Sequence, residues 1–504
     1  MKKRLWSVIL ALCLMLSVFA LGEGAQEGMW YEVFVYSYSD YDGDGIGDLR
    51  GLISKLDYIQ YMGYTGIWLM PVMPSPSYHK YDVTDYFDID PAYGTLDDMR
   101  ELVSECHARG IRVIIDLVVN HTSTRHKWFQ LAATSLRFGN LTNKYIGYYN
   151  FRQTGGSGYA RLDNTGWFYE EQFSGGNMPD LNLENPDVKR QIEKIMRFWL
   201  TDVDVDGFRL DAVTSYMSTT AGSIEFLSWL NDAAKAIKPD CYIVGEAWTS
   251  LGVISEYYQS GVDSFFLFPA SQAEGYIVTS IKAAAPAESY VKALLATEQA
   301  IPEGIIAPFL GNHDTGRTVG LLQARSDPDK AKFAEGILNM FPGSVFTYYG
   351  EEIGMVGSGV DPNKRIGMYW ADGEITTPPP GATRTEYAYP GVYEQMEDEN
   401  SLLSYCRQIN LLKAANPVVM QGRTEAVQVE KTCCVLRRFT EDDECLIAIN
   451  FDRENPASVS LTGAYTLAGE LEIAQESASV ETADGTSLLT LPPYGIALLR
   501  NAEN

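Results

Sequence analysis

Short apolar runs alternate with segments of helical periodicity over most of the chain, from about Tyr31 to Tyr349. Among the helical segments, Leu96–Arg109 precedes the third apolar run and Val188–Asp202 precedes the fourth. Apolar strands separated by helices are typical of a parallel sheet that is covered on both faces. The pattern therefore predicts an α/β fold, a (β/α)8 barrel, with strands at Tyr31–Tyr36, Gly66–Val72, Arg112–Val118, Gly207–Ala212, Tyr242–Ala247, Ser264–Pro269, Ile306–Gly311 and Ser344–Gly350.

Two stretches interrupt this alternation. Residues 121–177 are rich in Gly, Asn, Tyr and Thr and lack strong periodicity. A structureless loop of that length is uncommon, so we expect a small irregular β-domain inserted after the third strand. After a last barrel helix at Ser401–Ala415, short alternating runs such as Cys434–Arg438 and Leu446–Asn450 predict an antiparallel β-sandwich. The expected domains are a barrel formed by 28–120 and 178–415, the insertion 121–177, and the C-terminal sandwich 416–504.

The N-terminal segment has the features of a signal peptide. Basic residues at positions 2–4 precede an apolar stretch, and Ala20 is a suitable small residue before a cleavage site. We therefore expect residues 1–20 to be removed and the mature protein to be secreted, either to the exterior or to a periplasm. Lipoprotein anchoring through Cys13 is the alternative, which the large Leu12 before it disfavours. No later stretch is long and apolar enough to span a membrane.

Composition narrows the classes of partner. The formal net charge of the 504-residue chain is -27, which repels nucleic acid and anionic membranes. A neutral or cationic ligand suits such a surface, and we expect a monomer with no nucleic-acid partner. Six of the seven cysteines lie outside the leader at irregular spacing. Because a chain of this length can build a large core without staples, we expect mostly free thiols.

Acidic residues end three of the apolar runs: Asp211, Glu246 and Asp314. A fourth segment, Asp116–His121, ends an earlier run. In a (β/α)8 barrel the C-terminal ends of the strands meet on one face, so these side chains should share a cleft. Converging carboxyl groups, without a Ser/His/Asp set or a His-rich metal cluster, are suited to cleaving a glycosidic bond.

The order and spacing of these motifs resemble the α-amylase superfamily, glycoside hydrolase family 13. The resemblance covers nearly all of the mature chain, and Met178–Asn182 is similar to the intermediary group between α-amylases and oligo-1,6-glucosidases or neopullulanases. It implies the fold predicted above. The segments that carry it are Gly63–Leu69, Asp116–His121, Met178–Asn182, Gly207–Asp211, Gly245–Trp248, Gly311–Asp314 and Tyr348–Met355.

The resemblance also implies roles for individual residues. Asp211 aligns with the catalytic nucleophile, Glu246 with the general acid/base, and Asp314 with the third carboxylate that grips substrate hydroxyls. The implied substrate-binding residues are His79, Tyr81, His121, Arg209 and His313.

The neighbours of two catalytic residues fit these roles. Arg209 lies two residues before Asp211, so on a strand both side chains point to one side and a cation stands beside the nucleophile. Ala247 and Trp248 follow Glu246, and an apolar setting there should raise the pKa of Glu246.

An acidic loop near the N-terminus suggests Ca2+. Carboxylates that alternate with small residues offer hard oxygen ligands, although the distal Glu of an EF-hand is missing. The loop resembles the first-loop Ca2+ site of many family members, and a solvated acidic turn is the alternative. The expected ligands are Asp40, Asp42, Asp44, Asp48 and the Ile46 carbonyl. Asn120 and Asp180 align with ligands of a second Ca2+, which relatives with similar motifs lack, so the sequence leaves that site open.

Specificity is the least determined property. Thr214 and Ser215 stand where typical α-amylases have Lys-His, which weakens the expected grip on the leaving-group side. His79 is more like an α-amylase than an α-glucosidase, which usually has an acid in that loop. We expect a secreted, retaining hydrolase of α-1,4 bonds in starch, glycogen or maltooligosaccharides. The alternatives are an α-glucosidase, a neopullulanase-like enzyme, a 4-α-glucanotransferase and, least favoured, a non-catalytic glycan-binding barrel.

Overall fold

The computed structural model describes residues 27–173, 175–473 and 476–502. Its central sheet has eight parallel strands in the order β10-β9-β8-β7-β3-β2-β1-β11, which confirms the predicted barrel. Each strand ends one to four residues before its predicted end, because the chain leaves the sheet where the site begins. The strands are β1 Met29–Val33, β2 Gly66–Leu69, β3 Arg112–Leu117, β7 Gly207–Leu210, β8 Tyr242–Gly245, β9 Ser264–Phe266, β10 Ile305–Ala307 and β11 Val345–Tyr348.

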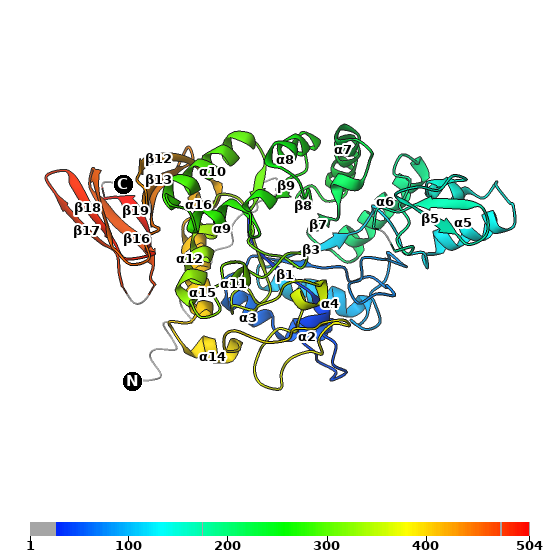
Figure 1. The fold of residues 1–504 in the computed structure, drawn as a ribbon, viewed down its shortest axis with the longest axis horizontal. Helices are drawn as coiled ribbons and strands as arrows, with labels where there is room; N and C mark the ends of the chain where they lie inside the picture. Colours follow the sequence, from blue (N-terminus) through cyan, green and yellow to red (C-terminus); the bar gives the residue numbers. More distant parts are fainter. Residues whose placement is uncertain (1–26, 174, 474–475, 503–504) are drawn as a thin grey trace.

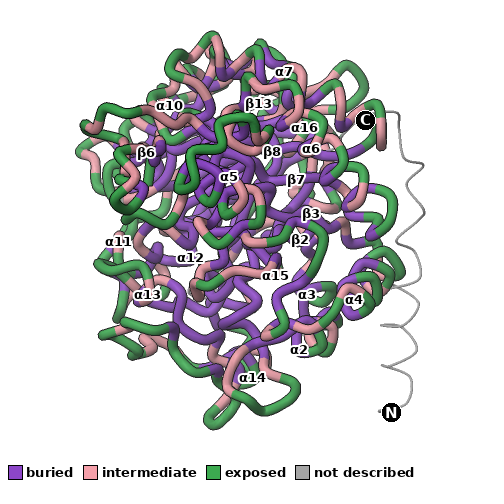
Figure 2. Tube along the Cα trace, turned by 90° about the vertical axis from the view of Figure 1, so that its right-hand side faces the viewer, coloured by how far each residue is buried: buried purple, intermediate pink, exposed green. Residues whose placement is uncertain are grey.

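Two backbone hydrogen bonds close the barrel between its edge strands. The Ser344 N–H donates to the Ile306 carbonyl at 2.8 Å, and the Phe346 N–H donates to the Pro308 carbonyl at 3.1 Å. Large side chains fill the interior, so the barrel is a packed core rather than a pore. Figure 2 shows the strands buried at its centre. The buried cluster inside is Trp30, Trp68, Ile114, Tyr242, Val244, Phe266, Phe268, Ala307, Phe309 and Phe346.

Helices surround this sheet, and the two helices predicted from periodicity are present. α4 (Leu96–Ala108) starts at a capping box formed by Thr95 and Asp98. α6 (Pro186–Arg197) continues as a π-helical turn over Phe198–Asp202. The other helices of this region are α2 Leu49–Ser54, α3 Leu56–Tyr61, α7 Thr220–Ile237, α8 Leu251–Tyr257, α9 Tyr276–Ile281, α10 Pro286–Ala300, α11 Thr318–Leu321, α12 Pro328–Asn339, α13 Asp361–Lys364, α14 Val392–Glu397 and α15 Leu402–Ala415.

The segment between β3 and α6 contains the expected small sheet and, in addition, a helix that was not predicted. It contains α5 (Lys127–Arg137), a 3-10 turn (Lys144–Tyr148) and an antiparallel sheet. α5 buries residues 129, 132, 133 and 136, which is the i, i+3, i+4, i+7 spacing of an amphipathic helix. The sequence of this segment therefore does have helical periodicity, but only over the 11 residues of α5. The sheet strands are β4 Phe151–Arg152, β5 Tyr159–Leu162 and β6 Trp167–Glu170.

The C-terminal region packs two antiparallel sheets, of five and three strands, against each other. An apolar cluster that includes Val435, Val459 and Leu489 fills the space between them, which confirms the predicted sandwich. In Figure 1 this region and the inserted unit lie at opposite ends of the molecule. After the short helix α16 (Val418–Gln421), its strands are β12 Arg423–Val429, β13 Cys433–Phe439, β14 Glu444–Asn450, β15 Ala457–Thr462, β16 Tyr465–Leu471, β17 Ser479–Ala483, β18 Thr486–Leu491 and β19 Ile496–Asn501.

Three other expectations concern the whole chain. The predicted leader, with Cys13, lies outside the described residues. Across the described ranges, no helix combines the length and the apolar character that crossing a bilayer requires. The expectation of free thiols is confirmed for the described cysteines, all of which are buried: Cys106, Cys241, Cys406, Cys433, Cys434 and Cys445.

Candidate active site

Arg209 on β7 joins the carboxyl groups of three neighbouring strand ends. Its Nη1 donates to Asp116 Oδ1 at 2.6 Å and to Asp211 Oδ1 at 2.8 Å. Its Nη2 lies 2.9 Å from Glu246 Oε2. The order β3-β7-β8 in the sheet makes this possible, because the three strands are adjacent and end on one face. Asp211 and Glu246, which the sequence predicted to converge, therefore meet at one guanidinium group.

Glu246 is held through one of its two carboxyl oxygens. Oε2 accepts the Ala212 N–H at 3.0 Å and faces Arg209, which leaves Oε1 to carry a proton. Burial raises the pKa of Glu246 to about 7, although the Arg209 charge opposes this. At neutral pH the group is thus poised between acid and base, as a general acid/base must be.

The two apolar neighbours of Glu246 are buried to different extents. Ala247 is fully buried, whereas Trp248 is 48% exposed. The Trp248 ring stacks on Phe268 with ring centroids 4.7 Å apart. The sequence correctly predicted a desolvated Glu246, and the contribution of Trp248 to that setting stays a prediction.

Asp116 belongs to this cluster; the sequence placed it in the shared cleft but assigned it no role. Its Oδ1 accepts from Arg209, while its Oδ2 accepts the Trp68 indole N–H at 3.1 Å and the Tyr81 hydroxyl at 3.3 Å. Burial raises the pKa of Asp116 to about 6, against the Arg209 charge. Its position in the Asp116–His121 motif was a signal that could have identified its role.

Asp314 follows β10 and is gripped by two cations. Its Oδ1 lies 2.6 Å from Arg365 Nη2 and its Oδ2 lies 2.9 Å from His313 Nε2. Burial alone would raise the pKa of Asp314, but the His313 and Arg365 charges outweigh it and hold that pKa well below its usual range. Its side chain remains 29% exposed, so an ionised carboxylate faces the cleft.

His313 and Arg209 are enclosed by the groups that they contact, because both side chains have no exposed surface. Their expected role as direct substrate contacts stays a prediction. His313 Nδ1 lies 2.6 Å from Glu32 Oε1. Burial lowers the pKa of His313, yet Asp314 and Glu32 raise it to about 9, so the ring is an imidazolium at neutral pH. Both residues act by holding the carboxylates in place.

Tyr81 links the two groups of charges. Its hydroxyl lies 2.7 Å from His313 Nε2 and donates to Asp116 Oδ2 at 3.3 Å. Its ring stacks on the His313 ring, with centroids 5.6 Å apart and planes 15° apart. The partly exposed Tyr81 therefore offers a fixed aromatic edge to the cleft, in agreement with its expected position.

His79 and His121, the other two histidines predicted to bind substrate, have lowered pKa values because of burial. His79 Nδ1 accepts the Tyr81 N–H at 3.2 Å, so the neutral ring carries its proton on Nε2. His121 is buried, and among the described residues its Nε2 has no hydrogen-bond partner. Phe173 packs edge-on against this ring at 5.2 Å. An unsatisfied ring nitrogen beside the nucleophile strand is suited to a substrate hydroxyl.

Arg365 is a functional residue that sequence reasoning missed. It lies after the last recognised motif, directly beyond α13. Besides Asp314, it binds the His313 carbonyl at 3.0 Å through Nε and the Tyr78 hydroxyl at 3.3 Å through Nη1. No local pattern marks this role, because its partners lie far away along the chain.

A pocket of about 590 Å³ lies beside the site, between the inserted unit and α7. Thr214 and Ser215 line it, together with Asn120 and Asp180. Both short side chains leave the wall uncharged at the positions where Lys-His was absent from the sequence. The pocket thus has room for sugar on this side, and its polar lining includes the charged side chains of Glu170, Glu184, Lys189 and Glu225.

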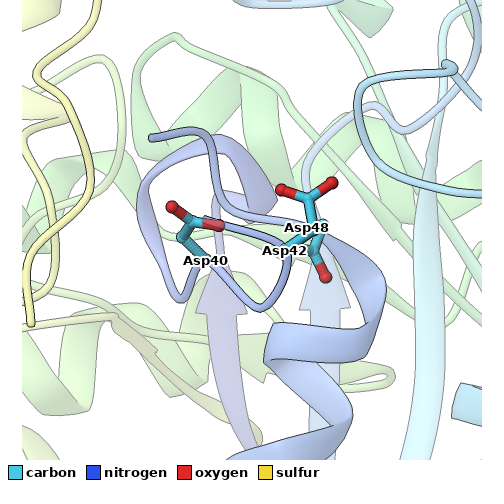
Figure 3. A group of neighbouring side chains, drawn as sticks. All are labelled: Asp40, Asp42 and Asp48. Atoms are coloured by element: carbon cyan, nitrogen blue, oxygen red, sulfur yellow. The ribbon is translucent and has the colours of Figure 1, made fainter. Parts of the chain in front are cut away.

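The acidic N-terminal loop brings together three of its four predicted carboxylates. Ligand oxygens of Asp40, Asp42 and Asp48 all lie within 4.8 Å of one another, and Figure 3 shows them on one loop. In the described part of the chain, none of the three forms an ion pair with Lys or Arg, so the donor set fits a hard cation. Asp44 does not join the group; its Oδ1 accepts the Ile46 N–H at 2.7 Å.

The second expected cation site fits less well. Asn120 Nδ2 donates to Asp180 Oδ1 at 3.3 Å, and the Gln172 N–H donates to Asp180 Oδ2 at 2.9 Å. Both oxygens of the carboxyl thus already accept hydrogen bonds, as those of Asp40 and Asp48 do, and burial raises the pKa of Asp180 to about 7. Within the described ranges, no group of three acidic, His or Cys ligands gathers here. The two residues lie together, and the second cation site stays a prediction.

Comparisons with known proteins agree with this geometry. The model of the alpha-amylase catalytic domain matches residues 32–422. Alpha-amylase 3 of Dictyoglomus thermophilum is 35% identical over 438 residues, 85% of each chain. An oligo-1,6-glucosidase of Parageobacillus thermoglucosidasius is 28% identical over 86% of this chain and 91% of its own. The solved structure of Eubacterium rectale Amy13B superposes with a TM-score of 0.90 at 40% identity, covering 95% of this chain and 96% of that one.

Proposed function

The chain belongs to the alpha-amylase family of glycoside hydrolases, and from this premise we propose that it cleaves α-1,4-glucosidic bonds in starch, glycogen or maltooligosaccharides with retention of configuration. The observation that carries the proposal is the ion-pair bridge of Arg209 between Asp211 and Glu246. One planar guanidinium group contacts both carboxyl groups, which favours the spacing of roughly 5–5.5 Å in retaining enzymes over the roughly 6.5–9.5 Å in inverting ones.

The proposed first step transfers one proton and exchanges one bond. Glu246 donates its proton to the glycosidic oxygen while the bond from that oxygen to the anomeric carbon breaks. Asp211 Oδ2, the oxygen that Arg209 does not hold, forms the new bond to the anomeric carbon. In the second step, Glu246 takes a proton from water, the resulting hydroxide attacks the anomeric carbon, and Asp211 leaves as a carboxylate.

Neighbouring groups bind the sugar that is attacked. Asp314 accepts hydrogen bonds from the hydroxyls of this sugar, because the low pKa of Asp314 keeps its carboxylate ionised. His121 Nε2 is available to another hydroxyl, and the Tyr81 ring covers the apolar face where positive charge develops. The assembly of Asp211, Glu246 and Asp314 in one site removes support for the non-catalytic alternative.

We further propose action on internal bonds of long glucans. His79 rather than an acid stands in the β2 loop, and the polar pocket beside Thr214 and Ser215 is open to further sugar units. Relatives named alpha-amylase and oligo-1,6-glucosidase both match the chain, so the α-glucosidase, neopullulanase-like and 4-α-glucanotransferase activities are the outcomes to separate by experiment.

Ca2+ is the proposed resident ion. Asp40, Asp42 and Asp48 would hold it, since their oxygens converge and carry negative charge without a protein cation among the described residues. A bound ion would neutralise this charge and so would stabilise the loop between β1 and α2. We also propose export through the leader at residues 1–20, to be checked by sequencing the N-terminus of the mature protein.

Product analysis over time tests the proposed specificity. Starch, pullulan, maltose and maltotriose are incubated with the enzyme, with Asp211→Asn as the matched inactive control. We expect starch viscosity to fall early and short maltooligosaccharides to accumulate. Glucose from maltose with unchanged starch viscosity would establish an α-glucosidase instead. Panose from pullulan would indicate a neopullulanase, and longer chains formed from maltotriose would indicate a glucanotransferase.

A further inference from the structure

Lys80 has an unusual environment within the loop that carries His79 and Tyr81. Its φ of 66° lies in the left-handed region, which a residue with a side chain rarely adopts. Its side chain is also buried, with 7% of the residue exposed. Lysine is almost never buried unless it is paired, so two unfavourable features meet at one residue. Such a position persists only where its surroundings hold it there.

Asp90 supplies the compensating contact. Lys80 Nζ lies 2.7 Å from Asp90 Oδ2 and 5.3 Å from the centre of the Tyr93 ring. The same carboxylate accepts the Ser75 N–H at 3.1 Å and the Ala92 N–H at 3.0 Å. Asp90 therefore ties the beginning, the middle and the end of the loop between β2 and α4.

The left-handed residue determines how its two neighbours are presented. It turns the chain back so that the Tyr81 N–H reaches His79 Nδ1 at 3.2 Å. The Tyr81 ring then stacks on His313, and its hydroxyl lies 2.7 Å from His313 Nε2. Loss of the turn would move the Tyr81 ring. It would also break the hydrogen bond that keeps the His79 proton on Nε2.

We propose that Lys80 is a positioning residue whose ion pair with Asp90 holds the left-handed turn that places Tyr81 and His79 in the cleft. This inference rests on the proposed function only in assigning Tyr81 to the sugar that is attacked. Lys80 itself acts through Tyr81 and His79, and its Nζ points to Asp90 rather than to substrate.

Lys80→Met tests the ion pair, because it keeps the apolar stem and removes the charge. We expect kcat/KM on 4-nitrophenyl α-maltotrioside to fall roughly 10- to 100-fold, mostly through kcat, since small displacements of positioning groups cost rate. The matched control is Lys235→Met, which breaks a similar pair with Asp263 at 2.9 Å at the other end of the barrel strands. The control should keep kcat/KM within about twofold of the wild type.

A double-mutant cycle with Tyr81→Ala separates positioning from a general loss of structure. If Lys80 works through Tyr81, Lys80→Met should cost clearly less in the Tyr81→Ala background than in the wild type, and the remaining loss should act through His79. Equal losses in both backgrounds would overturn the proposal, as would wild-type kinetics of Lys80→Met. Should that variant fail to fold, Asp90→Asn serves in the same cycle, because it removes the charge that pairs with Lys80 and keeps the size of the side chain.

The substrate choice keeps this test apart from the proposed specificity. 4-Nitrophenyl α-glucoside is assayed in parallel with the maltotrioside. If only the glucoside is cleaved, the proposal of internal α-1,4 cleavage fails, and the cycle with Lys80 and Tyr81 is read on the glucoside.

Discussion

Two groups of charges meet at Tyr81, and they balance in opposite ways. Around Arg209, one cation serves three carboxyl groups, those of Asp116, Asp211 and Glu246. Around Asp314, both His313 and Arg365 contact the one carboxylate, while Glu32 shares only His313. Both groups are largely buried, so desolvation acts on every acid in them.

The difference decides where protons reside. In the Arg209 group, burial prevails and raises the pKa of Glu246 to about 7 and that of Asp116 to about 6. In the Asp314 group, the two cations prevail, and the pKa of Asp314 is held well below its usual range. A carboxyl group thus becomes a proton donor in one group and a permanent anion in the other, because the number of nearby cations differs.

Removing the nucleophile should have the largest effect. Asp211→Asn keeps the shape of the side chain and its contact with Arg209, but the amide cannot form the glycosyl ester. We expect the rate of starch hydrolysis to fall by more than about 10³-fold with little change in melting temperature. Near-normal hydrolysis by this variant would contradict the assignment.

Glu246→Gln removes the proton from the Arg209 group. Starch hydrolysis should fall by roughly 10²- to 10³-fold, whereas glycosylation by an α-glucosyl fluoride should be largely retained, because fluoride leaves without a proton. Equal damage on both substrates would argue against Glu246 as the proton donor.

The wild-type pH profile sharpens the same point. Glu246 must be protonated to act as the acid, so kcat/KM on starch should decline as the pH rises through about 7. The fluoride substrate should lack this decline. A profile that is flat to pH 9 with starch would show that the Arg209 group does not hold the catalytic proton.

Arg365→Met tests the second group by removing one of its two cations. The pKa of Asp314 should rise, so activity should be lost at a higher pH on the acid side, with kcat/KM at neutral pH lowered roughly tenfold. Arg50→Met, which breaks an exposed pair with Asp98 at 2.6 Å, is the matched control. If kcat/KM falls at the same acidic pH in both variants, Arg365 does not set the pKa of Asp314.

The melting temperature should depend on pH in the same direction as the activity. A carboxyl whose folded pKa lies below the ordinary value of about 3.9 stabilises the fold above that pH. The contribution is lost as the pH falls toward the folded pKa. Arg365→Met should therefore lower the melting temperature at neutral pH and narrow the gap to the wild type in acid.

The acidic loop extends the comparison to a group in which the described residues provide no cation at all. EDTA should lower the melting temperature, because an ion bound only by the folded state contributes about 2.7 kcal/mol when its concentration is 100 times Kd. Asp42→Asn should abolish the response to added Ca2+, and Asp44→Asn, outside the group, should keep it. Equal responses of the two variants would refute this ligand set.

Local patterns in the sequence predicted much of this molecule. Each barrel strand is an apolar run, and Asp211 and Glu246 directly follow two of them. The i, i+3, i+4, i+7 spacing over Lys127–Arg137 was equally local, but it was hidden within a segment of weak overall periodicity. These features depend on near neighbours in the chain, and for that reason they can be read from it.

The charge balance depends on pairs that are distant in sequence. Arg209 and Asp116 are 93 residues apart, Arg365 and Asp314 are 51 apart, and His313 and Glu32 are 281 apart. The sequence by itself determined which acids stand at the ends of the strands. Only the closed barrel decided which cations each acid meets and how far it is desolvated, because electrostatic energy depends on distance and burial in space rather than on spacing along the chain.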